Sequence, residues 1–252
     1  MPLFETESLV LKSYNLAEAD RIVVFFTRDH GIVRGVAKGA KRLKSRFGST
    51  LELFSAINVT YFQKEDSELA SIQHAELSRS YFGEASNPDF LHTFSYVADL
   101  LMAFVPPHDP NETLYRMTKA CLEAASKKPE SLAGISLYFE LWMLRLGGYL
   151  PDWNHCGDCK STIAAADSAD LRSDFQLLCQ NCRKTLGTTQ ILPDHRELFH
   201  KVQKLSPAKF LEFSVEKESR GAELSAVLRR IISRVMGREG QAPYIYRRSN
   251  AV

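Results

Sequence analysis

The sequence predicts an α+β protein: a small β-barrel at the amino terminus, then a helical domain that a cysteine-rich segment interrupts. Three observations predict this class. Short segments rich in β-branched and aromatic residues fill roughly the first eighty residues. Helical periodicity begins after Asn87-Pro88. Two C-x2-C pairs lie between the later helical segments.

The composition is that of an ordinary folded protein. The chain has 252 residues, of which 44% are apolar, enough for two or three small domains. The start, Met1-Pro-Leu-Phe-Glu-Thr-Glu, is acidic where a signal peptide would be basic, and no apolar run approaches membrane-spanning length. We therefore expect a cytosolic protein with reduced thiols. The net charge of +2 says less than its distribution along the chain.

Five strands are expected in the first domain. A glycine-containing hairpin, Arg28–Gly31, and a polar turn, Gln63–Ser67, separate two pairs of them. Five strands of this length with a long basic connection fit a Greek-key barrel of the OB type, and an SH3-like barrel is the alternative that the sequence leaves open. The predicted strands are Ser8–Tyr14, Arg21–Thr27, Gly31–Arg34, Ala56–Phe62 and Leu69–His74.

The connection after the third strand is strongly basic. Its glycines let the backbone bend, so we expect the segment Gly35–Gly48 to leave a strand as a long loop with cations pointing outward. A polyanion such as nucleic acid is the natural partner, although a basic loop also serves solubility. Its position inside a strand domain favours nucleic acid. The six cations are Arg34, Lys38, Lys41, Arg42, Lys44 and Arg46.

Helices follow the barrel on both sides of the cysteine segment. The first has an Asn87 cap and ends before Pro106-Pro107, and a later one begins behind Ser206. Cys121 lies among apolar residues within a helix, where it is expected to be a small buried side chain. The other expected helices cover about 111–126, 129–146, 193–205, 207–213 and 221–236.

Cys156, Cys159, Cys179 and Cys182 form two C-x2-C pairs separated by nineteen residues. Tetrahedral zinc closes this spacing into one four-thiolate site with no open position, which indicates a structural metal. Two disulfides and four unligated thiols are the alternatives. His155 is expected to be an exposed neighbour. The metal would hold a segment that has few large apolar side chains of its own.

Several patterns typical of enzymes are absent from the sequence or have the wrong spacing. His195 and His200 are five residues apart, which puts them on different faces of a helix, and we expect that helix to be solvated. The chain has no phosphate-binding G-x4-G-K-[ST], no G-x-S-x-G and no deaminase pattern of H-x-E before P-C-x-x-C. The sequence therefore predicts a protein that is not an enzyme.

Three segments carry a family resemblance: Glu18–Thr27 followed by Gly31, the loop Ala37–Gly48, and the two C-x2-C pairs. Over nearly its whole length the chain resembles the bacterial DNA repair and recombination protein RecO. The resemblance implies an OB domain, a helical domain and a zinc-binding insertion. It also implies binding of single- and double-stranded DNA, strand annealing, and loading of RecA, together with RecR, onto strands coated by single-strand-binding protein. Because some members lack the cysteines, the zinc is expected to serve stability.

Carried over to this chain, the resemblance makes the six loop cations the phosphate contacts, with Arg21 a weaker candidate. Tyr14, Phe47 and Tyr61 could stack on bases, but barrel aromatics are more typical of core. The family's helical domain also receives the acidic, hydrophobic tail of single-strand-binding protein, which needs an apolar groove with a basic rim. The available cations are Lys201, Lys204, Arg229, Arg230 and Arg234.

We expect the chain to be organised as an OB domain (1–80), a first helical half (81–150), a zinc-binding insertion (151–188) and a second helical half with a tail (189–252). The expected location is the bacterial cytoplasm at the nucleoid, with no membrane partner. The alternative function is a zinc-ribbon nucleic-acid-binding factor in transcription or translation, in which the cysteine segment would make the contact. A metal-dependent hydrolase is a third class.

Overall fold

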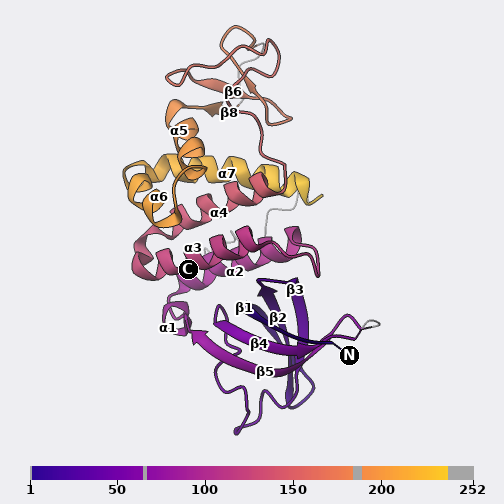
Figure 1. The fold of residues 1–252 in the computed structure, drawn as a ribbon. Coiled ribbons are helices and arrows are strands. Elements are labelled where there is room, and N and C mark those ends of the chain that lie inside the picture. The colour runs from indigo at the N-terminus through magenta and orange to yellow at the C-terminus, as the bar shows by residue number, and fades with distance from the viewer. Residues whose placement is uncertain (1, 65–66, 184–188, 238–252) are drawn as a thin grey trace, which may run out of the picture. The chain divides into compact units, whose positions relative to one another are not determined.

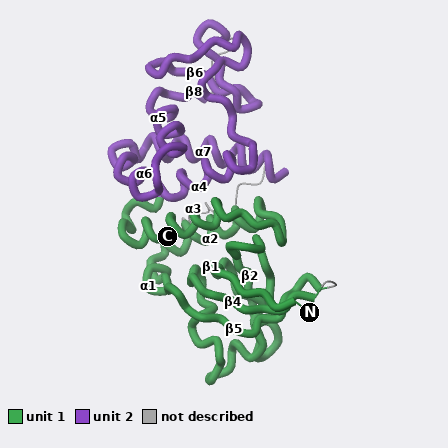
Figure 2. Tube along the Cα trace, in the orientation of Figure 1, with its two compact units in different colours: residues 1–132 green, residues 133–252 purple. Residues whose placement is uncertain are grey.

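The structure is a computed structural model that describes residues 2–64, 67–183 and 189–237. The chain divides into two compact units, residues 1–132 and residues 133–252 (Figure 2). None of the helices in the described residues is long and apolar enough to cross a membrane.

The first unit opens with a closed five-stranded barrel (Figure 1). Its order is β1-β2-β3-β5-β4, with β1 pairing back to β4 and β3 running parallel to β5. This is the OB-type Greek-key arrangement, so the predicted fold class is confirmed and the SH3-like alternative is set aside. The strands are β1 Leu3–Leu16, β2 Asp20–Thr27, β3 Gly31–Ala37, β4 Ala56–Phe62 and β5 Ala70–Arg79.

Alternation of side chains along the strands fills the barrel. Val23 and Phe25 on β2 point inward and are fully buried, together with Val59 on β4 and Ile72 on β5. The intervening side chains of β2 point outward, and Phe26 packs at 5.7 Å between ring centroids on Tyr115 of the following helices. The barrel is thus packed on its inside and, at β2, on one outer face as well.

Helices α1 (Phe82–Ala85), α2 (Pro88–Phe104) and α3 (Glu112–Lys127) complete the first unit. The side chain of Asn87 accepts hydrogen bonds at the start of α2, as predicted, and Asn111 caps α3 in the same way. Phe54, at the end of the basic connection, packs on Phe94 of α2 with ring centroids 5.8 Å apart. These contacts tie the two long helices to the barrel.

Four helices form the core of the second unit: α4 (Leu132–Leu146), α5 (Pro193–Val202), α6 (Pro207–Ser214) and α7 (Glu218–Val235). Tyr138 of α4 donates to the carbonyl of Leu205 at 2.9 Å. Glu140, fully buried on α4, accepts from Ser225 and Arg229 of α7. Helices before and after the cysteine segment therefore pack together within this unit. Ser206 occupies the cap position of α6, but its side chain makes no capping hydrogen bond.

The cysteine segment, inserted between α4 and α5, folds around a small three-stranded sheet of order β7-β6-β8. The strands are β6 Ala169–Leu171, β7 Leu177–Leu178 and β8 Thr189–Ile191. Trp153 is fully buried and stacks on Phe199 of α5 with ring centroids 4.6 Å apart. This aromatic pair joins the insertion to the helices.

Candidate nucleic-acid interface and metal centre

The basic connection between β3 and β4 is a series of tight turns. The backbone N–H of Arg42 donates to the carbonyl of Gly39 at 3.1 Å, and that of Ser45 donates to Arg42 at 2.9 Å. The same spacing recurs where Thr50 donates to Phe47 at 2.9 Å. The backbone of the connection is therefore folded on itself by local hydrogen bonds.

Two apolar side chains anchor the connection in the barrel. Phe47 is 1% exposed and Leu51 is 2% exposed, and both belong to the barrel core. Tyr61 is equally buried, whereas Tyr14 is half exposed. Of the three aromatic residues considered for base stacking, Phe47 and Tyr61 are thus core residues, as barrel aromatics typically are.

The hairpin between β1 and β2 holds the start of the connection. The backbone N–H of Gly39 donates to Asp20 Oδ1 at 2.8 Å, and that of Lys41 donates to the carbonyl of Ala19 at 2.9 Å. The Glu18–Thr27 segment and the basic loop, which are separate in sequence, are therefore in direct contact through Ala19 and Asp20. These hydrogen bonds fix the backbone at the start of the connection, around Gly39 and Lys41.

The six predicted cations are all exposed. Arg34 lies within β3, and Lys38, Lys41, Arg42, Lys44 and Arg46 lie on the connection. Throughout the described ranges, none of the six has a carboxylate within ion-pair distance. Arg46 instead donates to the carbonyl of Ile72 at 3.2 Å and lies over the ring of Phe47.

Arg21, the weaker candidate, behaves differently. Its guanidinium lies 3.4 Å from the carboxylate of Glu52, and both side chains are about one-third exposed. Glu52 is the acidic residue within the turns that follow the basic run. Arg21 therefore balances this carboxylate and leaves the five loop cations as a surface of one sign, which suits a polyanion.

The second unit brings the four predicted metal ligands together. The sulfurs of Cys156, Cys159, Cys179 and Cys182 all lie within 4.8 Å of one another, and the sulfurs of Cys159 and Cys179 are 3.8 Å apart. Four thiolates in a tetrahedron with metal–sulfur bonds of about 2.3 Å have sulfurs about 3.8 Å apart. The donor set therefore fits a tetrahedral ion, and all four cysteines are free of disulfides.

Each C-x2-C pair, Cys156–Cys159 and Cys179–Cys182, forms a tight backbone turn, or knuckle. The N–H of Lys160 donates to the carbonyl of Cys156 at 3.0 Å, and the N–H of Cys182 donates to the carbonyl of Cys179 at 3.0 Å. The N–H of Cys179 also points at the sulfur of Cys156, 3.5 Å away. Although burial opposes ionisation of Cys156, such backbone N–H groups lower the pKa of its thiol to about 6. The thiolate that a metal requires is favoured at Cys156, whereas contacts with the side chains of Cys159 and Cys179 raise the pKa of Cys182 to about 12.

Two neighbours of the first knuckle have structural roles. His155 is exposed, as expected, and its ring lies 2.7 Å from the carboxylate of Asp152 rather than among the sulfurs. Gly157 follows the first cysteine because a Cβ there would come within 2.6 Å of the Gln176 side chain. Gln176 lies next to β7, so the glycine lets the knuckle approach this strand closely.

A buried guanidinium connects the insertion to α5. Arg196 is 4% exposed and donates to the backbone carbonyls of Trp153, Ile163, Ala164 and Asp167, at 2.6–3.3 Å. Burial lowers the pKa of this guanidinium, and the charge of Asp167 opposes that shift. One side chain thus fixes the path of the insertion on both sides of the first knuckle.

The prediction that the helix carrying His195 and His200 is solvated is wrong. His195 is 3% exposed, with Nε2 2.9 Å from Glu223 Oε2 on α7, and burial lowers its pKa. Leu198 and Phe199 are buried as well. The sequence pattern misleads here because His195 and Arg196 are polar residues that lie on the inner face of the helix. Within the described residues, the histidines still join no metal-ligating group.

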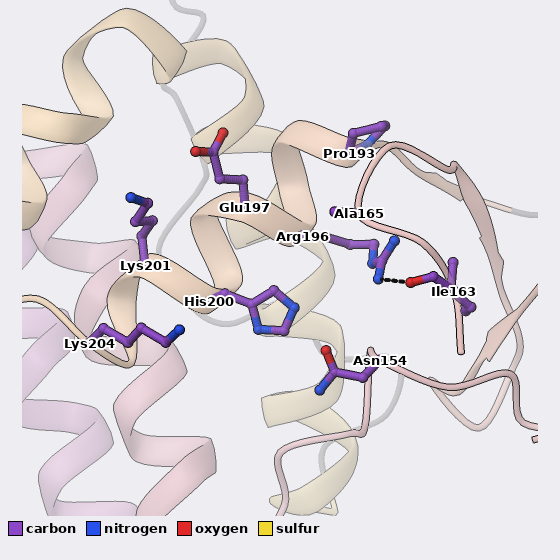
Figure 3. A pocket seen from close by; sticks show the side chains of 9 residues that line it. All are labelled: Asn154, Ile163, Ala165, Pro193, Arg196, Glu197, His200, Lys201 and Lys204. Atoms are coloured by element: carbon purple, nitrogen blue, oxygen red, sulfur yellow. Dashed lines mark hydrogen bonds between the residues drawn. The ribbon is translucent and has the colours of Figure 1, made fainter. Parts of the chain in front are cut away.

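A hollow of about 370 Å³ opens beside α5 (Figure 3). Apolar residues of the insertion line one side, and Lys204 and Asn154 extend from opposite sides of the His200 ring. Glu197 on the rim is engaged by Lys217 at 2.5 Å. The lining residues are Asn154, Ile163, Ala165, Pro193, Arg196, Glu197, His200, Lys201 and Lys204.

Comparison with known proteins covers both units. The family described as "Recombination protein O N terminal" matches residues 1–81, and "Recombination protein O C terminal" matches residues 88–241. The chain belongs to the recombination protein O family. A "DNA repair protein RecO" from Koribacter versatilis is 32% identical over 202 residues, which cover 78% of this chain and 79% of the relative. That from Geobacter metallireducens is 33% identical over 177 residues, covering 70% and 71%.

More distant members of the recombination protein O family span nearly the whole chain. A "DNA repair protein RecO" from Dehalococcoides mccartyi is 23% identical over 239 residues, covering 95% of this chain and 93% of the relative. The barrel, the basic connection and the cysteine insertion of this chain therefore all lie within the region shared with a DNA repair protein. The DNA-repair character of the family is established by these relatives.

Two positions important for the sites were not singled out in the sequence. Asp20 lies inside the Glu18–Thr27 segment, and Arg196 lies in the helix that the sequence predicts to be solvated. An acidic residue in a hairpin before a glycine-rich loop is a weak signal, since its partner is distant in sequence. Arginine in an amphipathic pattern is usually exposed, so its burial gives no local sign.

Replacing Arg196 by alanine should loosen the insertion. The change leaves four carbonyls without their charged donor and should cost about 3 kcal/mol or more of unfolding free energy. Hydrogen exchange across residues 152–178 measures it, with faster exchange expected there than in the barrel.

The matched control is Arg220→Ala, which removes a partly exposed arginine from α7 whose ion pair with Glu223 stays within one helical turn, and it should change exchange little. Equal protection of the insertion in Arg196→Ala and Arg220→Ala would contradict the structural role of Arg196.

Proposed function

We propose that this protein is a DNA-binding recombination mediator that acts without a chemical step. It binds single and double strands through the β3–β4 connection, anneals complementary strands and, with RecR, loads RecA onto strands coated by single-strand-binding protein. The observation that carries the proposal is the group of exposed loop cations with no carboxylate partner among the described residues, on a backbone anchored by Phe47 and Asp20.

Annealing follows physically from this arrangement. Two complementary strands repel each other through their phosphates, and cations that neutralise both sets lower that barrier and raise the local strand concentration. A side chain that contacts phosphate leaves the base edges free to pair. Because the connection is held by its own turns, little backbone order has to be gained on binding.

The alternative of a zinc-ribbon factor in transcription or translation is less well supported. The cations of the insertion are engaged locally: Arg172 pairs with Asp158 and Asp174, and Arg183 lies 3.6 Å from Asp170. Lys160 donates to the carbonyl of Gly157 at 2.8 Å. Such contacts leave less free charge for phosphates than the loop of the barrel offers.

Changing Lys38, Lys41 and Arg42 together to alanine should weaken binding to DNA. Because fewer counterions are released, the slope of log affinity against log salt should become shallower by about 2 for single strands, near 0.7 per lost phosphate contact. Titration of labelled single strands at several salt concentrations measures both quantities.

The control variant has the same loss of charge at exposed positions elsewhere: Arg116, Lys127 and Lys209 changed to alanine. Its affinity and slope should stay close to those of the unchanged protein. An unaltered slope in the loop variant would remove the connection from the interface, and a loss of binding in Cys156→Ser alone would favour the zinc-ribbon factor.

We propose that the ion held by the four cysteines is zinc and that it serves stability. When bound, the ion joins the two knuckles and supplies no reaction chemistry, because the four thiolates complete a tetrahedral coordination shell. The insertion has a small core around Trp153 and Leu177, so a cross-link between knuckles adds a large share of its stability.

Cys159→Ser should lower the zinc content well below one ion per chain. Cys121→Ser is the matched control, since Cys121 is fully buried in α3 of the other compact unit and is not one of the four clustered cysteines, so the zinc content should be unchanged. Elemental analysis of the purified variants measures zinc directly. Full zinc content in Cys159→Ser, or another metal in the unchanged protein, would contradict the assignment.

We propose that the hollow beside α5 receives the acidic, hydrophobic tail of single-strand-binding protein. Ile163, Ala165 and Pro193 offer apolar lining, and Lys201 and Lys204 offer the basic rim that such a tail requires. The other three cations of the later helices do not line the hollow. Arg229 pairs with the buried Glu140, Arg230 donates to Thr189, and Arg234 donates to the carbonyl of Ser173.

The double change Lys201→Glu and Lys204→Glu should weaken binding of a labelled tail peptide by about tenfold or more, since it reverses two charges at the rim. Fluorescence anisotropy measures the affinity. The same double reversal at Lys127 and Lys209, both exposed, is the control. Equal affinity of the two double variants would place the tail elsewhere.

The proposal extends to organisation and location. We propose that segments 1–80, 81–150, 151–188 and 189–252 are the functional divisions, and that the protein works at the nucleoid in the bacterial cytoplasm. The two compact units are defined by contacts rather than by roles, so they leave these divisions as a proposal.

A further inference from the structure

Leu43 is the most exposed of the large apolar side chains in the part of the chain that the structure describes. Its side chain is fully exposed, whereas the next most exposed, Phe82, has a relative exposure of 63%. Single apolar residues on a surface are ordinary. The position of Leu43 is not ordinary, because it lies at the centre of the strongest run of positive charge in the chain.

A tight turn presents this side chain. The N–H of Ser45 donates to the carbonyl of Arg42 at 2.9 Å, so Leu43 and Lys44 occupy the two central positions of the turn. Phe47, four residues after Leu43, is held in the barrel core. The leucine therefore extends from a turn whose base is fixed on the barrel.

The charges around Leu43 select its partner. Arg42 and Lys44 flank it directly and Lys41 precedes them, and none of the three has a carboxylate within ion-pair distance in the described ranges. A turn so charged attracts a polyanion, and the polyanion that also offers flat apolar surfaces is nucleic acid. A protein partner would need a far larger apolar area than one leucine supplies.

We propose that Leu43 inserts between adjacent bases of the strand whose phosphates are held by the neighbouring cations. This rests on the proposed DNA-binding function of the connection and assigns a wedge to it. Apolar side chains such as leucine act in this way in other nucleic-acid-binding proteins, where they unstack one base step. A strand unstacked at that step would lose local self-structure and present its bases for pairing.

A strand with a single 2-aminopurine tests the wedge, because the fluorescence of this base rises when it is unstacked. Leu43→Ala should reduce the rise on binding to less than about half, with affinity changed by less than about tenfold and the salt slope unchanged, since the cations remain. Leu43→Met should retain the rise. The control is Leu77→Ala, which removes an exposed leucine of β5.

The outcomes separate this inference from the function on which it rests. If the unchanged protein binds with a steep salt slope but gives no fluorescence rise, or if Leu43→Ala keeps the full rise, the wedge is overturned and DNA binding stands. If the unchanged protein shows no salt-dependent binding, both fail. A Leu43→Ala variant that loses binding to anionic vesicles while keeping the full rise would assign the leucine to a membrane surface and overturn the wedge.

Discussion

The structure of the candidate interface depends on the anchoring of one loop in the barrel. Phe47 and Leu51 are buried in the barrel core, and burial of each contributes about 2 kcal/mol or more. Asp20 adds a hydrogen bond at the start of the loop. Without these contacts the cations would lie on a chain that has to be ordered on binding, and that entropy would weaken the interaction. The buried side chains of the loop therefore lower the entropy cost of binding a polyanion through its exposed cations.

The cysteine insertion solves a related problem with polar groups. Its apolar core is small, so the segment relies on a cluster of sulfurs and on a guanidinium that satisfies four carbonyls. Arg196 holds the backbone just before and just after the first C-x2-C pair, at Trp153 and Ile163, and the cysteines join that pair to the second one. A metal cross-link alone would fix the knuckles but leave their attachment to α5 to the stacking of Trp153 on Phe199.

The elements and the cysteine cluster could be predicted because their signals are local. Ala56–Phe62 was predicted to the residue, and the helix after Asn87 begins and ends where its cap and Pro106 indicate. What could not be predicted depends on distant partners. Asp20 finds the N–H of Gly39 only after the barrel closes, and Arg196 meets carbonyls some thirty to forty residues earlier in the chain. Periodicity in the sequence predicts helices and strands, but it does not predict hydrogen bonds between residues that are distant in the chain.

The distribution of ion pairs explains why net charge is a poor guide here. In the second unit, Arg229 pairs with a fully buried carboxylate and Arg172 with two aspartates, so these cations stabilise the fold. In the barrel loop the acidic residue that follows, Glu52, is balanced by Arg21 instead of by the loop cations. A chain with a net charge of only +2 can thus present a strongly basic surface, because its carboxylates are used elsewhere. The pairing of each cation, more than the number of cations, decides where a polyanion binds.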